Sequence, residues 1–296
     1  MNFKSGFVTI IGRPNVGKST LLNSIIGEKI AIMSDKPQTT RHKITAMYND
    51  DDSQIIFVDT PGIHKPKNKL GDFMVNSAIG AIKDVDVVIL MVDHSGKIGP
   101  GDQYLIDLVK ESKKKVILAI NKTDLIKPEE FKEIFETYLA FDFVEEVVGL
   151  SAINAKGIED LIKAIKKKLP EGPPFYPVDT MTDQTERSIC GEIIREKILR
   201  YLDEEIPHGV AVEIQSFKQR PDKAIIDIEA NIICEKNSHK GIIIGKNGRK
   251  LKGIGKSSRT EMELFLNSKV NLQLWVKVRE GWRDNSGLLK NLGYKE

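Results

Sequence analysis

The sequence predicts an α/β domain with a mostly parallel sheet and flanking helices, followed by a smaller α+β domain. Three observations lead to this fold class. Apolar strand segments alternate with amphipathic helices over the first ~170 residues, which is typical of a parallel sheet covered on both faces. A proline-rich segment then interrupts the pattern, and the remaining chain follows a different order of helices and strands.

In the first domain, predicted for residues 1–170, the strands are short apolar segments. The segment VDVVILMVD (85–93) is almost continuously apolar, as expected for a strand that helices cover on both faces. The helix of residues 19–26 should end at Gly27, and a later helix places its apolar residues on one stripe. The predicted strands are 7–11, 44–48, 54–59, 85–93, 116–121 and 146–151, and the stripe consists of Ile158, Leu161, Ile162, Ile165 and Leu169.

The segment PEGPPFYP (170–177) has four prolines in eight residues and predicts a linker, which we place at residues 171–180. The second domain, 181–296, has the predicted order α–β–β–α–α–β. Its last strand alternates between apolar and polar residues, as a half-buried strand does. The predicted elements are a helix at about 184–203, strands at 209–217, 223–234 and 270–278, and two helices divided at 245–248.

Composition excludes several classes of protein. The 296-residue chain is 40% hydrophobic and 29% charged, which favours a soluble globular protein over a disordered one. The longest apolar stretch, 85–92, carries Asp86 and is too short to cross a bilayer, and the N-terminus lacks a signal-peptide pattern. We interpret Cys190 and Cys234 as buried free thiols rather than a disulfide or redox pair, which predicts a cytoplasmic protein.

The segment GRPNVGKS (12–19) matches the phosphate-binding pattern GxxxxGK[ST] and lies between a predicted strand and a predicted helix. Its glycines let backbone N–H groups surround phosphates, and the N-terminus of the helix adds partial positive charge. Lys18 is expected to reach the β- and γ-phosphates, and the Ser19 hydroxyl to bind Mg²⁺. The alternative, a glycine-rich turn with a surface lysine, does not require the flanking strand and helix.

Two further motifs follow later strands. DTPG (59–62) closes the strand 54–59, so that Asp59 can hold the Mg²⁺ shell through water and the Gly62 N–H can sense a γ-phosphate. NKTD (121–124) identifies the base, because an ionised Asp124 accepts from two donors on one edge of guanine, whereas adenine has no such pair. A site of this kind rejects a ligand without the donors by about 10⁴–10⁵-fold.

The remaining contacts to the base are weaker predictions. Asn121 is expected to brace the pocket, and the stem of Lys122 to lie over the base. Ser151 and Ala152, in the segment LSA, are placed to put a backbone N–H on guanine O6. An ATPase has no use for NKTD, so the motifs together predict GTP and GDP as ligands.

The motifs GRPNVGKS, QTTRH (38–42), DTPGI, NKTD and LSA resemble the TRAFAC-class P-loop GTPases and, within them, the Era family, over the whole chain. The resemblance implies that Thr40 joins Mg²⁺ when the γ-phosphate is present; the residues alone do not favour Thr40 over Thr39. Ile63 stands where Ras-like enzymes place a water-orienting glutamine, so hydrolysis is expected to be slow and to need other help. The resemblance implies a K⁺ ion held with Asn15, and the alternative is that Asn15 only shapes the loop.

The predicted site residues follow from these motifs and this resemblance. Catalytic roles fall to Asn15, Lys18, Thr40 and Gly62, and metal binding to Ser19, Thr40 and Asp59. The nucleotide-binding residues are Gly12, Arg13, Pro14, Asn15, Val16, Gly17, Lys18, Ser19, Thr20, Asp59, Thr60, Pro61, Gly62, Ile63, Asn121, Lys122, Thr123, Asp124, Ser151 and Ala152.

The second domain carries GKNG (245–248) between two predicted helices, within a run of eight basic residues and no acid from Lys236 to Arg259. A helix–GxxG–helix unit lets a nucleic-acid backbone approach closely, with Lys246 meeting a phosphate. This arrangement resembles a type II KH domain; the alternative is a helix break with solvated lysines. The predicted RNA-binding residues are Ile243, Ile244, Gly245, Lys246, Asn247, Gly248, Arg249, Lys250 and Lys252.

The resemblance to the Era family implies partners: the 3′ end of 16S rRNA and the small (30S) ribosomal subunit. It also implies peripheral association with the inner face of the cell membrane, which no other feature supports. The favoured function is a slow, monomeric switch that converts GTP and water to GDP and phosphate, with Mg²⁺, and binds single-stranded RNA in 30S assembly. The alternative is an RNA chaperone in which GTP binding is structural and hydrolysis incidental.

Overall fold

The computed structural model describes residues 2–34, 36, 39–63, 65–95, 97–203, 206–221 and 223–294. The chain divides into two compact units: unit 1 comprises Met1–Pro66 and Met74–Asp183, and unit 2 comprises Lys67–Phe73 and Gln184–Glu296. Segment 67–73, which the sequence places in the first domain, groups with unit 2. There the Phe73 ring packs edge-on against Tyr294, with centroids 5.7 Å apart, and the Lys69 N–H donates to Asp284 over 3.2 Å.

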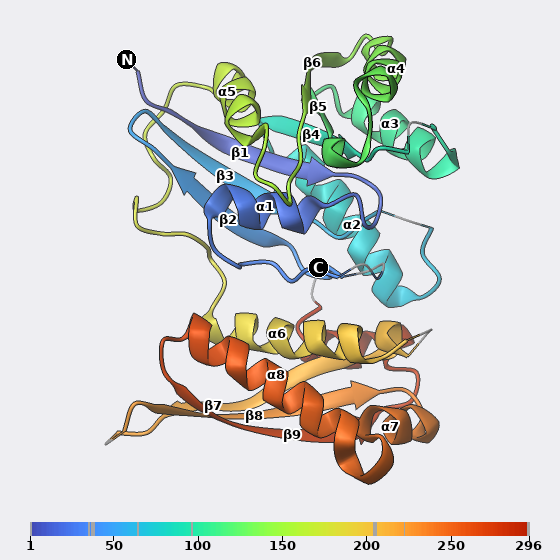
Figure 1. Ribbon diagram of the computed structural model, residues 1–296, viewed down its shortest axis with the longest axis vertical. Coiled ribbons are helices and arrows are strands. Elements are labelled where there is room, and N and C mark those ends of the chain that lie inside the picture. The colour runs from blue at the N-terminus through green and yellow to red at the C-terminus, as the bar shows by residue number, and fades with distance from the viewer. Residues whose placement is uncertain are drawn as a thin grey trace. The chain divides into compact units, whose positions relative to one another are not determined.

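Unit 1 is built on a six-stranded sheet in the order β2-β3-β1-β4-β5-β6 (Figure 1). Among the described residues β2 alone runs antiparallel to its neighbour, so the fold is the expected mostly parallel α/β sheet. The carboxyl ends of the parallel strands meet at one edge, where ligands of such sheets bind. The strands are β1 (Lys4–Ile11), β2 (Ile44–Asn49), β3 (Ser53–Asp59), β4 (Val87–Val92), β5 (Lys115–Ile120) and β6 (Val144–Gly149).

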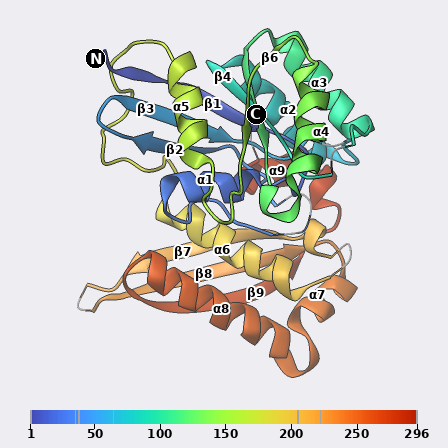
Figure 2. The same ribbon diagram turned by 45° about the horizontal axis from the view of Figure 1, so that its top comes forward.

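Helices cover both faces of this sheet (Figure 2). Leu22 of α1 and Leu161 of α5 lie in the core on one face, whereas Ile82 of α2, Ile106 of α3 and Ile134 of α4 lie in the core on the other. The prediction that Gly27 ends α1 is confirmed, because it has φ 80° and its N–H donates to Asn23 O. The helices are α1 (Lys18–Ile26), α2 (Lys69–Lys83), α3 (Pro100–Ser112), α4 (Pro128–Leu139) and α5 (Ile158–Lys168), with a 3₁₀ turn η1 (Thr123–Leu125).

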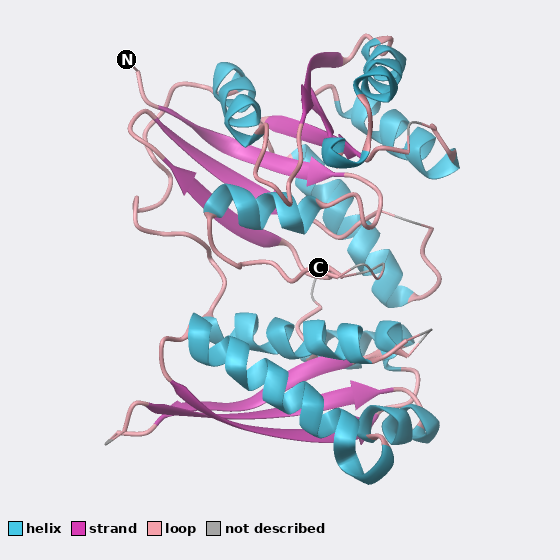
Figure 3. Ribbon diagram, viewed as in Figure 1, coloured by secondary structure: helices cyan, strands magenta, loops and turns pink. Residues whose placement is uncertain are grey.

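The proline-rich segment is a loop that passes the amino ends of β1 and β3 and is followed by residues that reach the edge strand β2 (Figure 3). The buried side chain of Gln54, on β3, accepts from the N–H groups of Phe175 and Tyr176 over 2.7 and 3.0 Å and donates to Tyr176 O over 2.8 Å. On the edge strand β2, the Met47 N–H donates to Met181 O over 2.9 Å. These bonds explain why unit 1 extends to Asp183 and why a strand that reads as apolar buries an amide side chain.

Unit 2 is an α+β domain whose three-stranded sheet has the order β7-β8-β9, with β7 antiparallel and β9 parallel to β8. Figure 1 shows α6 and α8 side by side on one face of this sheet. The order α6-β7-β8-α7-α8-β9 confirms the predicted type II KH fold class. The elements are α6 (Glu186–Tyr201), η2 (Pro207–Gly209), β7 (Ala211–Gln219), β8 (Ile225–Cys234), α7 (Asn237–Ile244), η3 (Lys246–Gly248), α8 (Arg249–Phe265), β9 (Lys269–Val278), η4 (Trp282–Asp284) and α9 (Ser286–Asn291).

The two cysteines are free and buried, as predicted. Burial raises the pKa of the Cys190 thiol to about 12 and also raises that of Cys234, so neither carries a reactive thiolate. In the part of the chain that the structure describes, every helix is too short or too polar to cross a membrane.

Candidate nucleotide and RNA sites

The phosphate loop leaves β1 at the carboxyl edge of the sheet and enters α1, and its glycines are required by contact as well as by backbone conformation. Gly17 has φ 108°, and a Cβ there would lie 2.3 Å from Asn121 Nδ2. A Cβ at Gly12 would lie 2.5 Å from the backbone oxygen of Met91. The loop therefore packs directly against the ends of β4 and β5, and any side chain at these glycines would push it out of place.

Lys18 is buried at the start of α1, and its ammonium lies inside the loop. Nζ donates to the backbone oxygens of Gly12 and Arg13, each over 3.1 Å. Burial lowers the pKa of Lys18 to about 8, although the negative charge of Asp59 acts in the opposite direction. A desolvated ammonium of this kind gains a strong partner when phosphate oxygens enter the loop.

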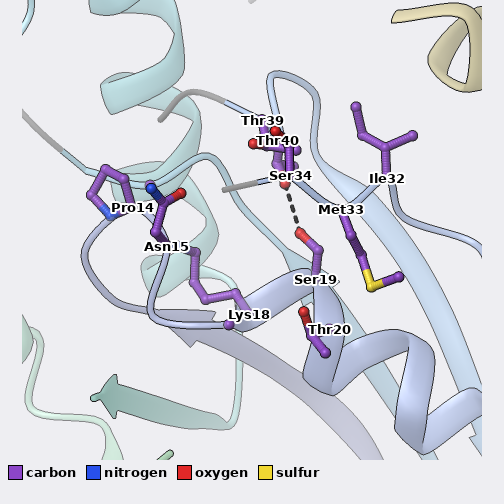
Figure 4. A pocket seen from close by; sticks show the side chains of 12 residues that line it. Pro14, Asn15, Lys18, Ser19, Thr20, Ile32, Met33, Ser34, Thr39 and Thr40 are labelled. Carbon is purple, nitrogen blue, oxygen red and sulfur yellow. Dashed lines mark hydrogen bonds between the residues drawn. The ribbon is translucent and has the colours of Figure 1, made fainter. Parts of the chain in front are cut away.

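Three oxygen-bearing side chains, Ser19, Thr40 and Asp59, converge next to Lys18 and fit a magnesium ion; Figure 4 shows the Ser19 and Thr40 hydroxyls facing each other. The Ser19 hydroxyl lies 2.9 Å from the Thr40 hydroxyl and donates to Asp59 Oδ2 over 3.0 Å, and Thr40 donates to the same oxygen over 3.4 Å. Asp59 is fully buried, and its Oδ1 has no hydrogen-bond partner among the described residues. Hydroxyl and carboxylate oxygens are the ligands that Mg²⁺ takes, so the donor set matches the predicted metal.

Asp59 also shows why a cation is needed at this point. Burial raises the pKa of the Asp59 carboxyl, and the charge of Lys18 and hydrogen bonds from Ser19 and Thr40 oppose that rise only in part. A divalent cation would restore the ionised form. Thr39 takes no part in this cluster, because its hydroxyl donates to Lys36 O over 2.6 Å. Of the two threonines, Thr40 is thus the one whose hydroxyl contacts both Ser19 and Asp59 in the described part of the chain.

The pocket mouth is formed by the phosphate loop, the turn after β3 and the segment before β2. Asn15 is exposed at this mouth with φ 66°, a conformation that asparagine tolerates better than most residues. A Cβ at Gly62 would lie 3.1 Å from Pro14 N, so the turn passes close to the loop. The lining residues are Pro14, Asn15, Gly17, Lys18, Ser19, Thr20, Ile32, Met33, Ser34, Thr39, Thr40 and Gly62.

Three residues of the predicted nucleotide-binding set have buried side chains. Ile63 and Val16 are buried in the two apolar cores of unit 1, and Thr60 is buried with its hydroxyl bonded to Ile10 O over 3.3 Å. Contact of these three residues with a nucleotide would therefore come from their backbone. Gln38 of the QTTRH motif lies outside the described residues.

Asn121 connects the phosphate loop to the segment after β6. Its Nδ2 donates to Val16 O over 2.7 Å, and its Oδ1 accepts from the Ala152 N–H over 3.0 Å. The Ser151 N–H donates to Lys156 O over 3.0 Å. Both amides predicted for guanine O6 therefore have hydrogen-bond partners within the protein.

Asp124 is exposed, and a neighbouring side chain orients its carboxylate. The Ser151 hydroxyl donates to Asp124 Oδ1 over 2.5 Å, and this bond fixes the plane of the carboxylate. Thr123 supports the turn through its N–H, which donates to Leu150 O over 3.2 Å. Serine at position 151 thus has a physical role that its sequence context does not reveal.

In unit 2, the GKNG turn has the backbone of a close-approach loop. Gly245 and Gly248 have φ 71° and 72°, and Asn247 between them has φ 52°. Lys246 and Asn247 are exposed at the tip, as are Arg249 and Lys250 after it. Ile243, in contrast, is fully buried in the core of unit 2, so it supports the turn from beneath and cannot touch RNA; this corrects its predicted role.

A groove of about 450 Å³ lies beside this turn, between α8 and β9. Its lining includes Gly248 and Lys252 of the predicted RNA-binding set and further residues outside that set. Lys256 and Arg259 follow Lys252 at helical spacing on α8, and that spacing within the acid-free run is the signal from which they could have been predicted. The additional lining residues are Leu251, Gly255, Lys256, Arg259, Leu272 and Leu274.

Comparison with known proteins matches both halves of the chain. The family described as 50S ribosome-binding GTPase matches residues 7–122, and the KH domain family matches residues 205–283. GTPase Era from Alkaliphilus metalliredigens (strain QYMF) is 57% identical over 295 residues, which covers 100% of both chains. GTPase Era from Clostridioides difficile (strain 630) is also 57% identical over 295 residues, with 99% of each chain covered.

Two solved structures have nearly the same backbone. A point variant of Aquifex aeolicus Era bound to GDP·AlF₄⁻ has a TM-score of 0.96 and 39% identity, with 99% of this chain and 100% of that chain covered. Era in complex with MgGDPNP and nucleotides 1506–1542 of 16S ribosomal RNA has a TM-score of 0.96, 40% identity and the same coverage. The similarity is therefore one of the whole chain, and both units are included in it.

Proposed function

This chain belongs to the Era family of GTPases, and from this premise we propose that it is a slow GTP-driven switch that binds the single-stranded 3′ end of 16S rRNA in assembly of the small ribosomal subunit. As a member of that family it is a GTP-hydrolysing enzyme with a KH domain. The observation that carries the switch proposal is the Ser19–Thr40–Asp59 cluster. It joins α1, the segment before β2 and the end of β3, which are the parts that a γ-phosphate and its metal would hold together.

In hydrolysis, the residues of unit 1 would position GTP and neutralise charge. Ser19, Thr40 and Asp59 would hold Mg²⁺, which stabilises the charge that develops on the phosphate oxygens. Lys18 would donate to the β- and γ-phosphates, and the Gly62 N–H to the γ-phosphate. Ile63 packs in the core and cannot orient water, which is the reason for expecting a slow rate.

We also propose that a K⁺ ion beside Asn15 supplies part of the missing positive charge. Asn15 is exposed at the pocket mouth, where its amide oxygen would be one ligand of the ion and the ion would supply positive charge near the phosphates. The remaining nucleotide contacts are proposed as the motifs suggest: Asp124 reads the base edge, Lys122 covers the base, and Asn121 braces the pocket. Mg²⁺ and GTP or GDP are the ligands, consistent with the MgGDPNP of the Era–RNA complex.

Unit 2 is proposed to bind single-stranded RNA in the groove between α8 and β9. Lys252, Lys256 and Arg259 would meet phosphates on one side, while Leu272 and Leu274 give an apolar wall for bases. A KH groove takes about four nucleotides. The relative whose structure contains 16S rRNA nucleotides supports the 3′ end of this RNA as the target.

The RNA proposal is tested with a double-lysine variant in the groove and a single-lysine control outside it, compared per positive charge removed. Lys252→Ala combined with Lys256→Ala should weaken binding of a 16S 3′-end oligonucleotide and flatten the salt dependence, by ~0.7 in slope for each lost phosphate contact. Lys277→Ala removes a lysine from an exposed position of β9 that alternates away from Leu272 and Leu274, and it should change neither quantity. Equal losses of RNA affinity for the groove variant and the Lys277→Ala control would mean that the groove lysines make no specific contact with RNA.

The burial of Ile63, at the position where a water-orienting side chain would be expected, favours a second candidate function: an RNA chaperone in which GTP hydrolysis is incidental. If hydrolysis is incidental, a Thr40→Ala variant that binds GTP but does not hydrolyse it should still support maturation of the 30S subunit. If hydrolysis drives the switch, the same variant should stall maturation with the protein bound to the particle. The measurement is the fraction of mature 16S rRNA in cells that depend on the variant.

We further propose a division of labour along the chain: GTPase function in residues 1–170, a linker at 171–180, and RNA binding in 181–296. We place the protein in the cytoplasm with its rRNA target, as a monomer. Sedimentation at micromolar concentration would overturn the monomer proposal if it gave twice the mass of the chain.

A further inference from the structure

A second group of charged side chains lies at the carboxyl ends of the strands, beside the nucleotide pocket. Asp93 directly follows β4, the strand between β1, which leads to the phosphate loop, and β5, which leads to NKTD. Adjacent parallel strands end side by side, so a residue at the end of β4 lies between the phosphate loop, which follows β1, and NKTD, which follows β5. The motifs as predicted from sequence give Asp93 no role.

The two carboxylate oxygens of Asp93 face different partners. Oδ1 accepts from the Ser95 hydroxyl over 2.7 Å, from the Ser95 N–H over 3.1 Å and from Arg13 over 3.2 Å. Oδ2 lies 3.8 Å from Lys122 Nζ, as an ion pair. Three hydrogen bonds to one oxygen fix the plane of the carboxylate, and so they direct the other oxygen toward the lysine of NKTD.

Arg13 is held on its far side by a second acid. Its Nε lies 2.7 Å from Asp102 Oδ1, and Asp102 Oδ2 accepts from the Gly99 N–H over 3.0 Å at the start of α3. Asp102 is buried, whereas Asp93 and Lys122 keep 18% and 32% of their side-chain surfaces exposed. Lys122 is therefore connected through Asp93 and Arg13 to the buried carboxylate of Asp102.

We propose that Asp93 is a positioning residue for guanine-nucleotide binding, which holds the Lys122 ammonium so that the lysine stem is already in place to cover the base. Lys122 has φ 64°, so its backbone direction is unusual and is set by the turn into η1. The Lys122 side chain has many rotamers, and an ion pair at its end reduces the number that it samples in the free protein. Less side-chain entropy is then lost when the nucleotide binds. This inference rests on the proposed nucleotide site and adds a residue that acts through Lys122 and does not touch the ligand.

Removal of the charge at Asp93 should weaken the binding of GDP and GTP by the same factor. An ion pair with this exposure predicts a loss of about fivefold for Asp93→Asn. The hydrolysis rate at saturating GTP should change by less than about twofold, because Arg13 of the phosphate loop keeps its 2.7 Å ion pair with Asp102 when Asp93 is changed. Asp93→Glu, which keeps the charge, should recover part of the affinity, and the difference from wild type should shrink as salt rises.

The matched control and the double variant separate this role from general effects. Asp142→Asn removes the same charge from an exposed residue of unit 1, whose ion pair with Lys110 is 3.9 Å long, and it should leave nucleotide affinity unchanged. Lys122→Met keeps the stem but removes the ammonium. In that background Asp93→Asn should have no further effect, because the partner through which it acts is gone.

The experiment is titration of fluorescent GDP and GTP into the full-length variants, with melting temperatures measured in parallel. The inference would be overturned if Asp93→Asn weakened nucleotide affinity by less than about twofold. It would also be overturned if Asp93→Asn still weakened affinity by about fivefold in the Lys122→Met background. Either result would leave the proposed function intact as long as the wild type binds guanine nucleotides. Failure of the wild type to bind guanine nucleotides would instead overturn the proposed function. If Asp93→Asn does not fold, the comparison of wild type with Lys122→Met at low and high salt measures the same ion pair.

Discussion

Binding of GDP should weaken about tenfold when the pH is raised from 7 to 9, because of Lys18. In the free protein, burial lowers the pKa of Lys18 to about 8 from its ordinary value of 10.5. Phosphate oxygens around the ammonium favour the charged form, so the pKa in the complex should return to its ordinary value or above. The complex then keeps the proton throughout this pH range, whereas the free protein loses it.

The magnitude follows from the protonated fraction of the free protein. With a pKa of about 8, this fraction is about 0.9 at pH 7 and about 0.1 at pH 9, and the observed association constant falls by the same ratio. The stability of the free protein should change in the opposite direction. The unfolded chain, in which Lys18 has its ordinary pKa of 10.5, binds more protons than the folded one between pH 8 and 10.5, so this group makes folding more favourable as pH rises.

The assay is titration of fluorescent GDP at fixed ionic strength from pH 7 to 9, with thermal unfolding of the nucleotide-free protein over the same range. Lys18→Met should bind GDP more weakly, and any pH dependence that it retains would report deprotonation of guanine itself. The wild-type slope in excess of that control belongs to Lys18. Equal slopes for the two proteins would refute the reasoning, since the ammonium would then be no more desolvated in the free site than in water.

Four other changes test single features of the site. Asp124→Asn should lose GTP and gain xanthosine triphosphate, measured by competition binding, because the second base donor then meets an amide donor. Replacing Na⁺ with K⁺ at fixed ionic strength should raise GTP turnover, and Asn15→Ala should abolish that difference. Ile63→Ala should lower unfolding free energy in urea by about 2–4 kcal/mol with little change in turnover, because the side chain lies in the core. Gly17→Ala should abolish nucleotide binding, seen by calorimetry, because its Cβ would lie 2.3 Å from Asn121 Nδ2.

The phosphate loop, the strands and the KH order were predictable because each depends on residues close together in the chain. The glycines at 12 and 17, the lysine at 18 and the apolar runs that precede them carry their meaning within a few positions. The same is true of GKNG, in which positive backbone angles require glycine or asparagine. Local backbone preference and hydrophobic period were sufficient for these features.

Contacts between distant segments were decided by the tertiary structure. Thr40 and Thr39 are equivalent in sequence, yet Thr40 alone of the two lies beside Ser19 and Asp59 in the described structure. Gln54 is buried because residues more than a hundred positions away bring backbone groups to it.

The edges of the sites show the same limit. The position of Ile243 beside the GKNG turn predicts a contact with RNA, but its side chain is packed in the core. Leu272 lines the groove although it lies on β9, more than twenty residues after the turn. Asp93 follows an ordinary buried strand, and its partners Arg13 and Lys122 follow two other strands, on either side of it in the sheet. The physical reason is that a parallel sheet gathers strand ends that are far apart in sequence, so no local pattern can report which charges will meet there.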